Sequence, residues 1–218
     1  GCADPCKAGM MRGPFMAASL AAAMAVPAAA HPVLDPGFGD NMVLQAGHPL
    51  VLSGQTQAGV TVTAKLGTSE ARAVSDAAGD FVITLPAQTA TAAPSTLTVS
   101  DATGASAYAN ILIGNVFLCG GQSNMELPVD RALDVDNQLR QAADDGVRLL
   151  MVPKSTAPVP QANFAAPTAW TAATAETVAP FSAACFYMAK ALRRKDPATP
   201  VGLIHANWGG SAARAWYD

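Results

Sequence analysis

The residues best suited to chemistry lie in a short polar turn, Gly120-Gly121-Gln122-Ser123-Asn124, that follows an apolar segment. A serine just past a strand and two glycines, at the start of a helix, lies at the carboxyl edge of a parallel sheet, where α/β folds hold their sites. The glycines allow a sharp turn, and the free N–H groups of the helix start would face the group that Ser123 attacks. This arrangement is typical of a serine nucleophile whose oxyanion is stabilised by the Ser123 amide. Taken alone, the spacing is explained more simply by Ser123 capping the helix.

Five further residues are candidates for the oxyanion site or its loops. Gly209 and Gly210 follow a later strand, so their amides could face an oxyanion, although two glycines after a strand are equally a plain turn. The side chain of Asn207 could donate another hydrogen bond to the same charge. Gly121 and Gln122 complete the set, and Gln122 could serve only to hold the loop in place.

No histidine is well suited to activate Ser123 as a general base. His31 and His48 lie in surface-like contexts, and His205 lies near the carboxyl end of a predicted strand. A triad base belongs on an edge loop beside an acid partner, so we expect His205 to be a hydrogen-bonded residue that lines the site. The three histidines also lack metal-ligand spacing, and we expect no metal site.

The aromatic and acidic residues near these segments have structural explanations. Trp208, Trp216 and Tyr217 could stack on a sugar ring, but we expect them to pack against apolar side chains. Glu126 and Asp130 are expected to complement the positive end of a helix rather than to form a catalytic carboxylate pair.

The second half of the chain alternates between segments typical of strands and of helices. Segments 116–119, 147–152 and 201–206 predict strands, and residues 134–143 and 182–194 have the apolar spacing of helices. This order predicts an α/β fold with a parallel sheet. Since a doubly wound sheet normally has about five strands and only three are found, the predicted sheet is incomplete.

Residues 31–113 predict a small antiparallel β-sandwich, which the α/β unit follows at residues 114–218. Short segments rich in Val, Ile, Leu and Thr alternate here with turns that contain Gly and Asp. In residues 60–66, apolar and polar side chains alternate, as in a strand with one solvent-exposed face. The segment 153–177, rich in Pro, Ala and Thr, is predicted to be a long surface loop anchored by Trp170.

The first thirty residues have the form of an export signal preceded by a few upstream residues. Arg12 supplies the positive start, Pro14–Val26 is apolar, and Ala28–Ala30 offers a small-residue cleavage site. The apolar run is too short for a stable membrane span, which takes about 20 residues. We therefore expect cleavage after Ala30 and a periplasmic or secreted protein.

Composition excludes some classes of partner. The 218 residues are 50% hydrophobic and 13% charged with a net charge of −3, and no run of Lys or Arg is present, so nucleic-acid binding is not expected. Cys119 and Cys185 lie in apolar runs and are expected to be small buried hydrophobes without a disulfide.

The segment Cys119–Val129 (CGGQSNMELPV) is similar to the nucleophile block of the sialate O-acetylesterase family, within the SGNH (GDSL-type) hydrolases. Asp40–Gln45 (DNMVLQ) resembles the opening of that family's N-terminal β domain, and residues 76–86 resemble a hairpin of it, with Phe81 in place of the usual Trp. Residues 113–116, 181–183 and 201–216 resemble further blocks, in register over residues 33–218. Arg214 stands where the family usually has Glu.

The resemblance implies an incomplete SGNH-type (flavodoxin-like) sheet in which Ser123 attacks the acetyl ester of a sialic acid or related sugar. An acyl-enzyme would form and water would release acetate, without a cofactor. The family's Asp-x-x-His, which supplies the base and its orienting acid, does not occur in this sequence. We expect that pair beyond residue 218 and expect these residues alone to be inactive. An acetylxylan or other polysaccharide deacetylase, and an inactive glycan-binding fragment, remain as alternatives.

Overall fold

The computed structural model describes residues 31–159, 161–212 and 214. The predicted export signal, residues 1–30, and the aromatic residues Trp216 and Tyr217 lie outside the described residues. Within the described ranges, no helix is long and apolar enough to cross a membrane.

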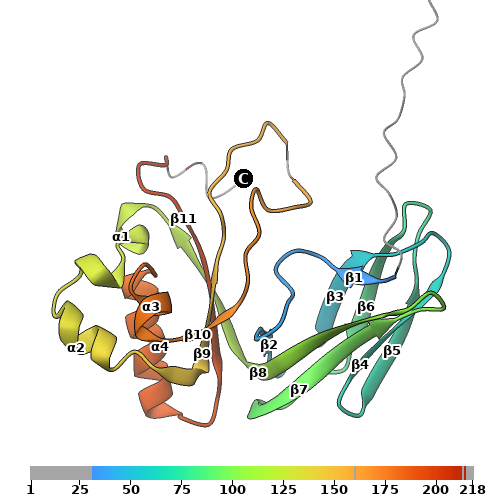
Figure 1. Ribbon diagram of the computed structural model, residues 1–218, viewed down its shortest axis with the longest axis horizontal. Coiled ribbons are helices and arrows are strands. Elements are labelled where there is room, and N and C mark those ends of the chain that lie inside the picture. Colours follow the sequence, from blue (N-terminus) through green and yellow to red (C-terminus); the bar gives the residue numbers. More distant parts are fainter. Residues whose placement is uncertain (1–30, 160, 213, 215–218) are drawn as a thin grey trace, which may run out of the picture.

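Two sheets pack face to face in the first half of the chain (Figure 1). One sheet has the order β1-β3-β6, and β4, β5, β7 and the first part of β8 belong to the other. The bounds are β1 (Val33–Leu34), β3 (Leu50–Gln55), β4 (Thr61–Leu66), β5 (Ser69–Val74), β6 (Asp80–Leu85), β7 (Thr91–Ser100) and β8 (Ala105–Gly121). All pairs among these strands are antiparallel, which confirms the predicted sandwich.

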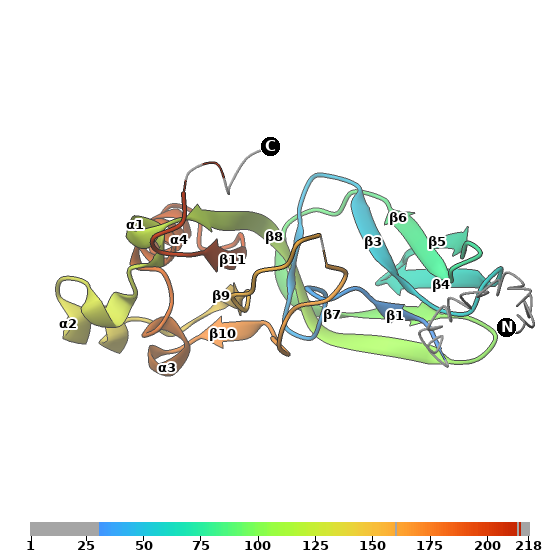
Figure 2. The ribbon, with the colours of Figure 1, turned by 90° about the horizontal axis from the view of Figure 1, so that it is seen from above.

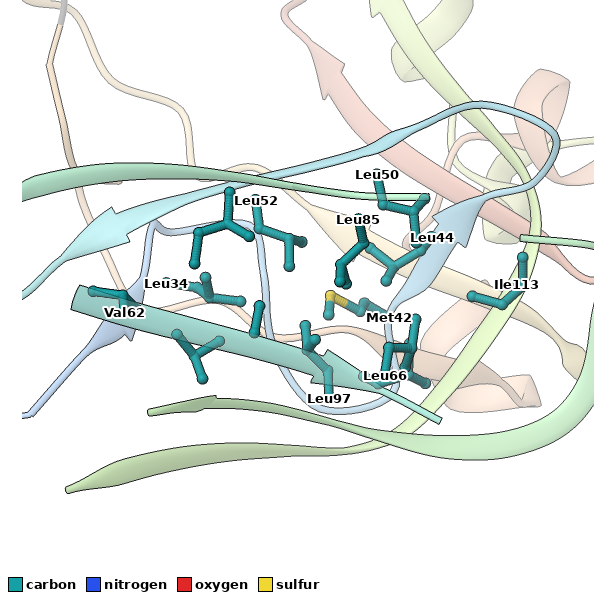
Figure 3. Packing of buried hydrophobic residues seen from close by; sticks show 14 of the residues in the cluster. Leu34, Met42, Leu44, Leu50, Leu52, Val62, Leu66, Leu85, Leu97 and Ile113 are labelled. Carbon is teal, nitrogen blue, oxygen red and sulfur yellow. The ribbon is translucent and has the colours of Figure 1, made fainter. Parts of the chain in front are cut away.

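Alternate residues of facing strands fill the core between the two sheets (Figure 3). Ile83 and Leu85 point inward from β6, and Val62 and Leu66 point inward from β4, while their neighbours in sequence are exposed or half-buried. Burying such a side chain contributes about 1.5–3 kcal/mol, so these alternating positions stabilise the sandwich.

Strand β8 joins the two halves of the molecule (Figure 2). It pairs antiparallel with β7 in its first part, and Asn115–Gly121 pair in parallel with β11 (Val201–Asn207). The short strand β2 (Val43–Gln45) pairs with β8 between these parts. The boundary expected between residues 113 and 114 therefore falls inside one strand.

The predicted parallel sheet is confirmed. β9 (Asp144–Met151) and β8 flank β11, all three are parallel, and β10 (Thr171–Ala173) adds an antiparallel edge. The helices lie on one side of this part of the sheet (Figure 1). They are α1 (Ser123–Glu126), the 3-10 helix η1 (Val129–Arg131), α2 (Val135–Arg140), α3 (Ala175–Val178) and α4 (Ala183–Lys195).

The prediction that the two cysteines are unpaired is wrong. Cys119, near the end of β8, and Cys185, in the first turn of α4, form a disulfide with a Cα–Cα distance of 6.2 Å. Both are buried, as expected. The pairing arises because Cys185 lies on the buried face of α4 that covers β8, a contact between residues 66 apart in sequence.

Gly114 lies where the chain passes from the sandwich to the parallel sheet, and Gly114→Ala is expected to lower the free energy of unfolding by about 1–3 kcal/mol. An added Cβ would overlap the Pro200 carbonyl oxygen, which accepts the Asn115 N–H at 2.9 Å and so has little room to move. The midpoint of urea unfolding measures the loss, provided that the dependence of the unfolding free energy on urea concentration is unchanged. Gly39→Ala is the control, because nothing lies within 4 Å of its added Cβ. Equal midpoints for the two variants would contradict the prediction.

Candidate active site

Ser123 is the first residue of α1, directly after β8. Gly121 has a φ of 140°, a conformation that favours glycine, and it turns the chain out of the strand. The N-cap of α1 is Gln122 rather than Ser123. The Ser123 hydroxyl, which is exposed, donates to Gln122 Oε1 at 3.2 Å. Ser123 therefore does not cap the helix, and Gln122 orients its hydroxyl.

A cavity of about 470 Å³ opens beside Ser123 at the carboxyl ends of the three parallel strands. Ser123 follows β8, Lys154 follows β9, and His205 lies in β11, so each strand brings one polar residue to the cavity. Arg131 of η1 also lines it. A site at this edge of the sheet fits the general rule for α/β folds.

Asn207 holds the nucleophile helix against the sheet. Its side-chain Nδ2 donates to the carbonyls of Met125 at 2.9 Å and Cys119 at 3.4 Å, and its Oδ1 contacts His205 Nε2. Both amide hydrogens are therefore engaged, and Asn207 is not free to donate to an oxyanion, contrary to its expected role. Since Oδ1 can only accept, the Nε2 of His205 carries the proton.

His205 is a buried, neutral histidine that lines the cavity, as the sequence predicts. Burial lowers its pKa, and the positive charge of Lys154 lowers that pKa further, whereas the hydrogen bond that its Nε2 donates to Asn207 raises it. Its Nδ1 is buried and has no hydrogen-bond partner among the described residues. The ring packs edge-on against Phe181 with centroids 5.1 Å apart.

Glu126 joins three segments that surround Ser123. One carboxylate oxygen accepts the Gly209 N–H, and the other pairs with Lys154 Nζ. Glu126 is thus more than a charge at the helix start, and the Gly209 amide is not free for an oxyanion. The Ser123 N–H itself donates to Gln122 Oε1 at 3.4 Å, so it could serve an oxyanion only by giving up that bond. The Gly210 N–H makes no hydrogen bond to any described residue, but Gly210 is not part of the lining of the Ser123 cavity.

None of the three histidines hydrogen-bonds to Ser123. His31 Nδ1 contacts Ser106 at 3.1 Å, and His48 is an exposed residue of the sandwich half. His205 directs its Nε2 to Asn207. In the part of the chain that the structure describes, no cluster of His, Cys, Asp and Glu could hold a metal ion.

The expectation that Trp208 packs in an apolar environment is wrong. Its side chain is 38% exposed, whereas Trp170 is 4% exposed and donates its indole N–H to the Gly37 carbonyl at 2.7 Å. Trp170 therefore anchors its loop as predicted. Trp208 directly follows the end of β11 and belongs to neither of the two hydrophobic cores, that of the sandwich and that of the parallel sheet.

No protein-family model matches the chain. Sialate O-acetylesterases from Pongo abelii and Homo sapiens are each 32% identical to it over 114 residues, covering 49% of this chain and 22% of theirs. The crystal structure of a carbohydrate acetylesterase from Xanthomonas citri matches with a TM-score of 0.81 and 34% identity, covering 86% of this chain and 42% of that one. The predicted similarity to the sialate O-acetylesterases is confirmed. The chain spans about a fifth of the length of those curated relatives.

Two residues of the cavity, Lys154 and Arg131, were not predicted from the sequence. Lys154 follows β9 within a segment predicted to be a plain surface loop, and Arg131 belongs to a short 3-10 helix without a sequence signature. The signal that could have found Lys154 is its position just past a predicted parallel strand. Arg214 is exposed.

Acidification is expected to destabilise the protein through His205. Burial holds the folded-state pKa of His205 below its ordinary 6.5. As the pH falls below about 6.5, the unfolded chain therefore binds a proton that the folded chain does not, and the free energy of unfolding decreases. Urea unfolding at pH 7.5 and 5.5 should show a smaller decrease for His205→Gln than for the unchanged protein. The exposed His48→Gln is the control, and identical decreases in all three proteins would contradict the assignment.

Proposed function

We propose that the protein is an esterase that removes O-acetyl groups from carbohydrates, with Ser123 as the nucleophile. The observation that carries this proposal is the exposed Ser123 hydroxyl at the wall of the 470 Å³ cavity, at the carboxyl edge of three parallel strands. The 34% identity to a carbohydrate acetylesterase of the same fold supports an acetylated sugar as the substrate.

In the proposed reaction, Ser123 Oγ attacks the acetyl carbonyl carbon while its proton passes to a base. The resulting oxyanion would be stabilised by the Ser123 amide, which would exchange its hydrogen bond to Gln122 Oε1 for one to the oxyanion. Collapse of the tetrahedral intermediate breaks the bond to the sugar oxygen, which leaves as a hydroxyl after taking up the proton. Water then attacks the acetyl-serine and releases acetate. Because Ser123 has no histidine partner among the described residues, we place the base in the family's downstream Asp-x-x-His.

The substrate that we propose is an O-acetylated sialic acid or a related sugar, and an acetylated polysaccharide such as acetylxylan is the alternative. Acetate release from each class by a protein that includes the Asp-x-x-His pair tests both. Ser123-dependent release from at least one of them is expected. If no acetylated sugar is hydrolysed while the protein still binds them, the chain is a glycan-binding module and the enzymatic proposal is wrong.

We also propose that the protein is exported and that residues 1–30 are removed after Ala30. The disulfide between Cys119 and Cys185 supports this, because such bonds persist mainly in oxidising compartments. N-terminal sequencing of the product expressed from Met10 or Met11 should find a chain that begins at His31. An uncleaved product in the cytoplasm would contradict the proposal.

A further inference from the structure

Trp208 has an exposed ring, and its backbone is held in place by two hydrogen bonds. The Trp208 N–H donates to the Gly121 carbonyl at 2.9 Å, which ties the residue to the end of β8. Its carbonyl accepts the Ser211 hydroxyl at 2.6 Å, which closes the turn that follows. A large apolar ring left 38% exposed on a fixed backbone loses little conformational freedom when a ligand covers it.

Trp208 lines a second cavity, of about 600 Å³, next to the one that holds Ser123. The rest of its lining is uncharged and mixed: Ser155 and Thr156 bring hydroxyls, Ala157 brings a methyl group, and Gly210 brings its backbone. The hydroxyls of Ser155 and Thr156 make no hydrogen bonds within the described ranges. Both cavities fall in the size range of pockets for small ligands, about 300–1,000 Å³.

The two cavities share a wall. Gly209 lines the Trp208 cavity and donates its N–H to Glu126, which lines the Ser123 cavity. Lys154 lines the Ser123 cavity, and its Nζ lies 5.9 Å from the centroid of the Trp208 ring. The Lys154–Glu126 ion pair and Gly209 therefore connect the linings of the two cavities, and a ligand seated at Ser123 would reach Trp208 by extending past them.

The lining matches a neutral sugar unit. A pyranose ring has an apolar C–H face that can cover an aromatic ring and a rim of hydroxyls that pair with serine, threonine and peptide groups. A charged group is not favoured, because the one cation at the wall, Lys154, is already paired with Glu126. An apolar ligand is not favoured either, because it would leave those hydroxyls and amides without partners.

We propose that the Trp208 cavity is a subsite for a second sugar unit, linked to the acetylated unit at Ser123. The substrate is then an O-acetylated oligosaccharide rather than a free monosaccharide. The position of the acetylated unit rests on the proposed function, whereas the binding of a neutral sugar at Trp208 does not.

Binding to the 218-residue chain with Ser123→Ala, which prevents turnover, tests the subsite. Dissociation constants are measured by calorimetry for O-acetylated sialyl-lactose against O-acetylated sialic acid, and for acetylated xylotriose against acetylated xylose. At least one oligosaccharide is expected to bind about three- to tenfold more tightly than its monosaccharide, the contribution of one aromatic contact. Trp208→Ala should remove that preference and Trp208→Phe should retain part of it.

Leu133→Ala is the matched control, because Leu133 is 92% exposed and lines neither cavity. Equal affinity for the short and long sugars, or a preference that survives Trp208→Ala, would overturn the subsite. Retained oligosaccharide binding in a protein whose ester hydrolysis does not depend on Ser123 would overturn the proposed function and leave the subsite standing.

Discussion

Ser123→Ala is expected to lower the turnover of acetyl esters by about four to six orders of magnitude in a protein that carries the family's Asp-x-x-His pair. The reason is that attack by an activated serine divides ester hydrolysis into two easier steps, and alanine offers no nucleophile for the first. Gln122 orients the Ser123 hydroxyl at 3.2 Å but cannot serve as its base, because an amide oxygen is not basic. Hydrolysis of p-nitrophenyl acetate gives the rates.

The 218-residue chain provides the paired measurement. We expect it to hydrolyse p-nitrophenyl acetate no faster than its own Ser123→Ala variant, because no described histidine contacts Ser123. A Ser123-dependent rate in this chain would show that the base lies within it and would point to His205. A longer protein that is active but indifferent to Ser123→Ala would show that the nucleophile has been wrongly assigned.

The second large effect is expected from loss of the disulfide. The paired replacement Cys119→Ala and Cys185→Ala should lower the free energy of unfolding by about 4 kcal/mol, since the bond closes a loop of 66 residues and restricts the unfolded chain. Replacement of both cysteines avoids leaving a free thiol. Urea unfolding of the oxidised protein and of the variant measures the difference.

Reduction gives an independent check on the same quantity. Dithiothreitol should lower the stability of the unchanged protein toward that of the double variant and leave the double variant unaffected. Thiol titration of the denatured, unreduced protein without residues 1–30, which contain Cys2 and Cys6, should find neither Cys119 nor Cys185 reactive. Two reactive thiols at positions 119 and 185, or a variant as stable as the oxidised protein, would contradict the pairing.

The elements that the sequence predicts well have local signals. Helix α4 begins after Ser182, whose hydroxyl accepts the Cys185 N–H at 3.3 Å, and ends at its basic residues, as its caps and spacing indicate. Strand β5 was not among the predicted strands. Its sequence, SEARAV, has few large apolar residues, and the residues on its inner face are only half-buried. Helix α2 ends at Arg140, three residues before its predicted end, where the Ala142 N–H bonds to the Leu139 carbonyl, three residues back, and the chain leaves the helix.

The candidate site was predictable only in its nucleophile. Ser123 has a local signature of strand, glycines and turn, but its neighbours are joined by contacts distant in sequence. Glu126 contacts Lys154 and Gly209, which are 28 and 83 residues away. No periodicity or spacing encodes such pairs. The exposure of Trp208 likewise depends on how the loop after β11 leaves the sheet.

Strand β8 belongs to both halves of the molecule. A cut between residues 113 and 114 would leave its pairs with β7 in the sandwich and its seven pairs with β11, from Asn115 to Gly121, in the other piece. Such a cut would also divide the three residues with which β8 pairs with β2. For anyone dividing this protein for expression or grafting, the usable break points therefore lie in loops outside β8.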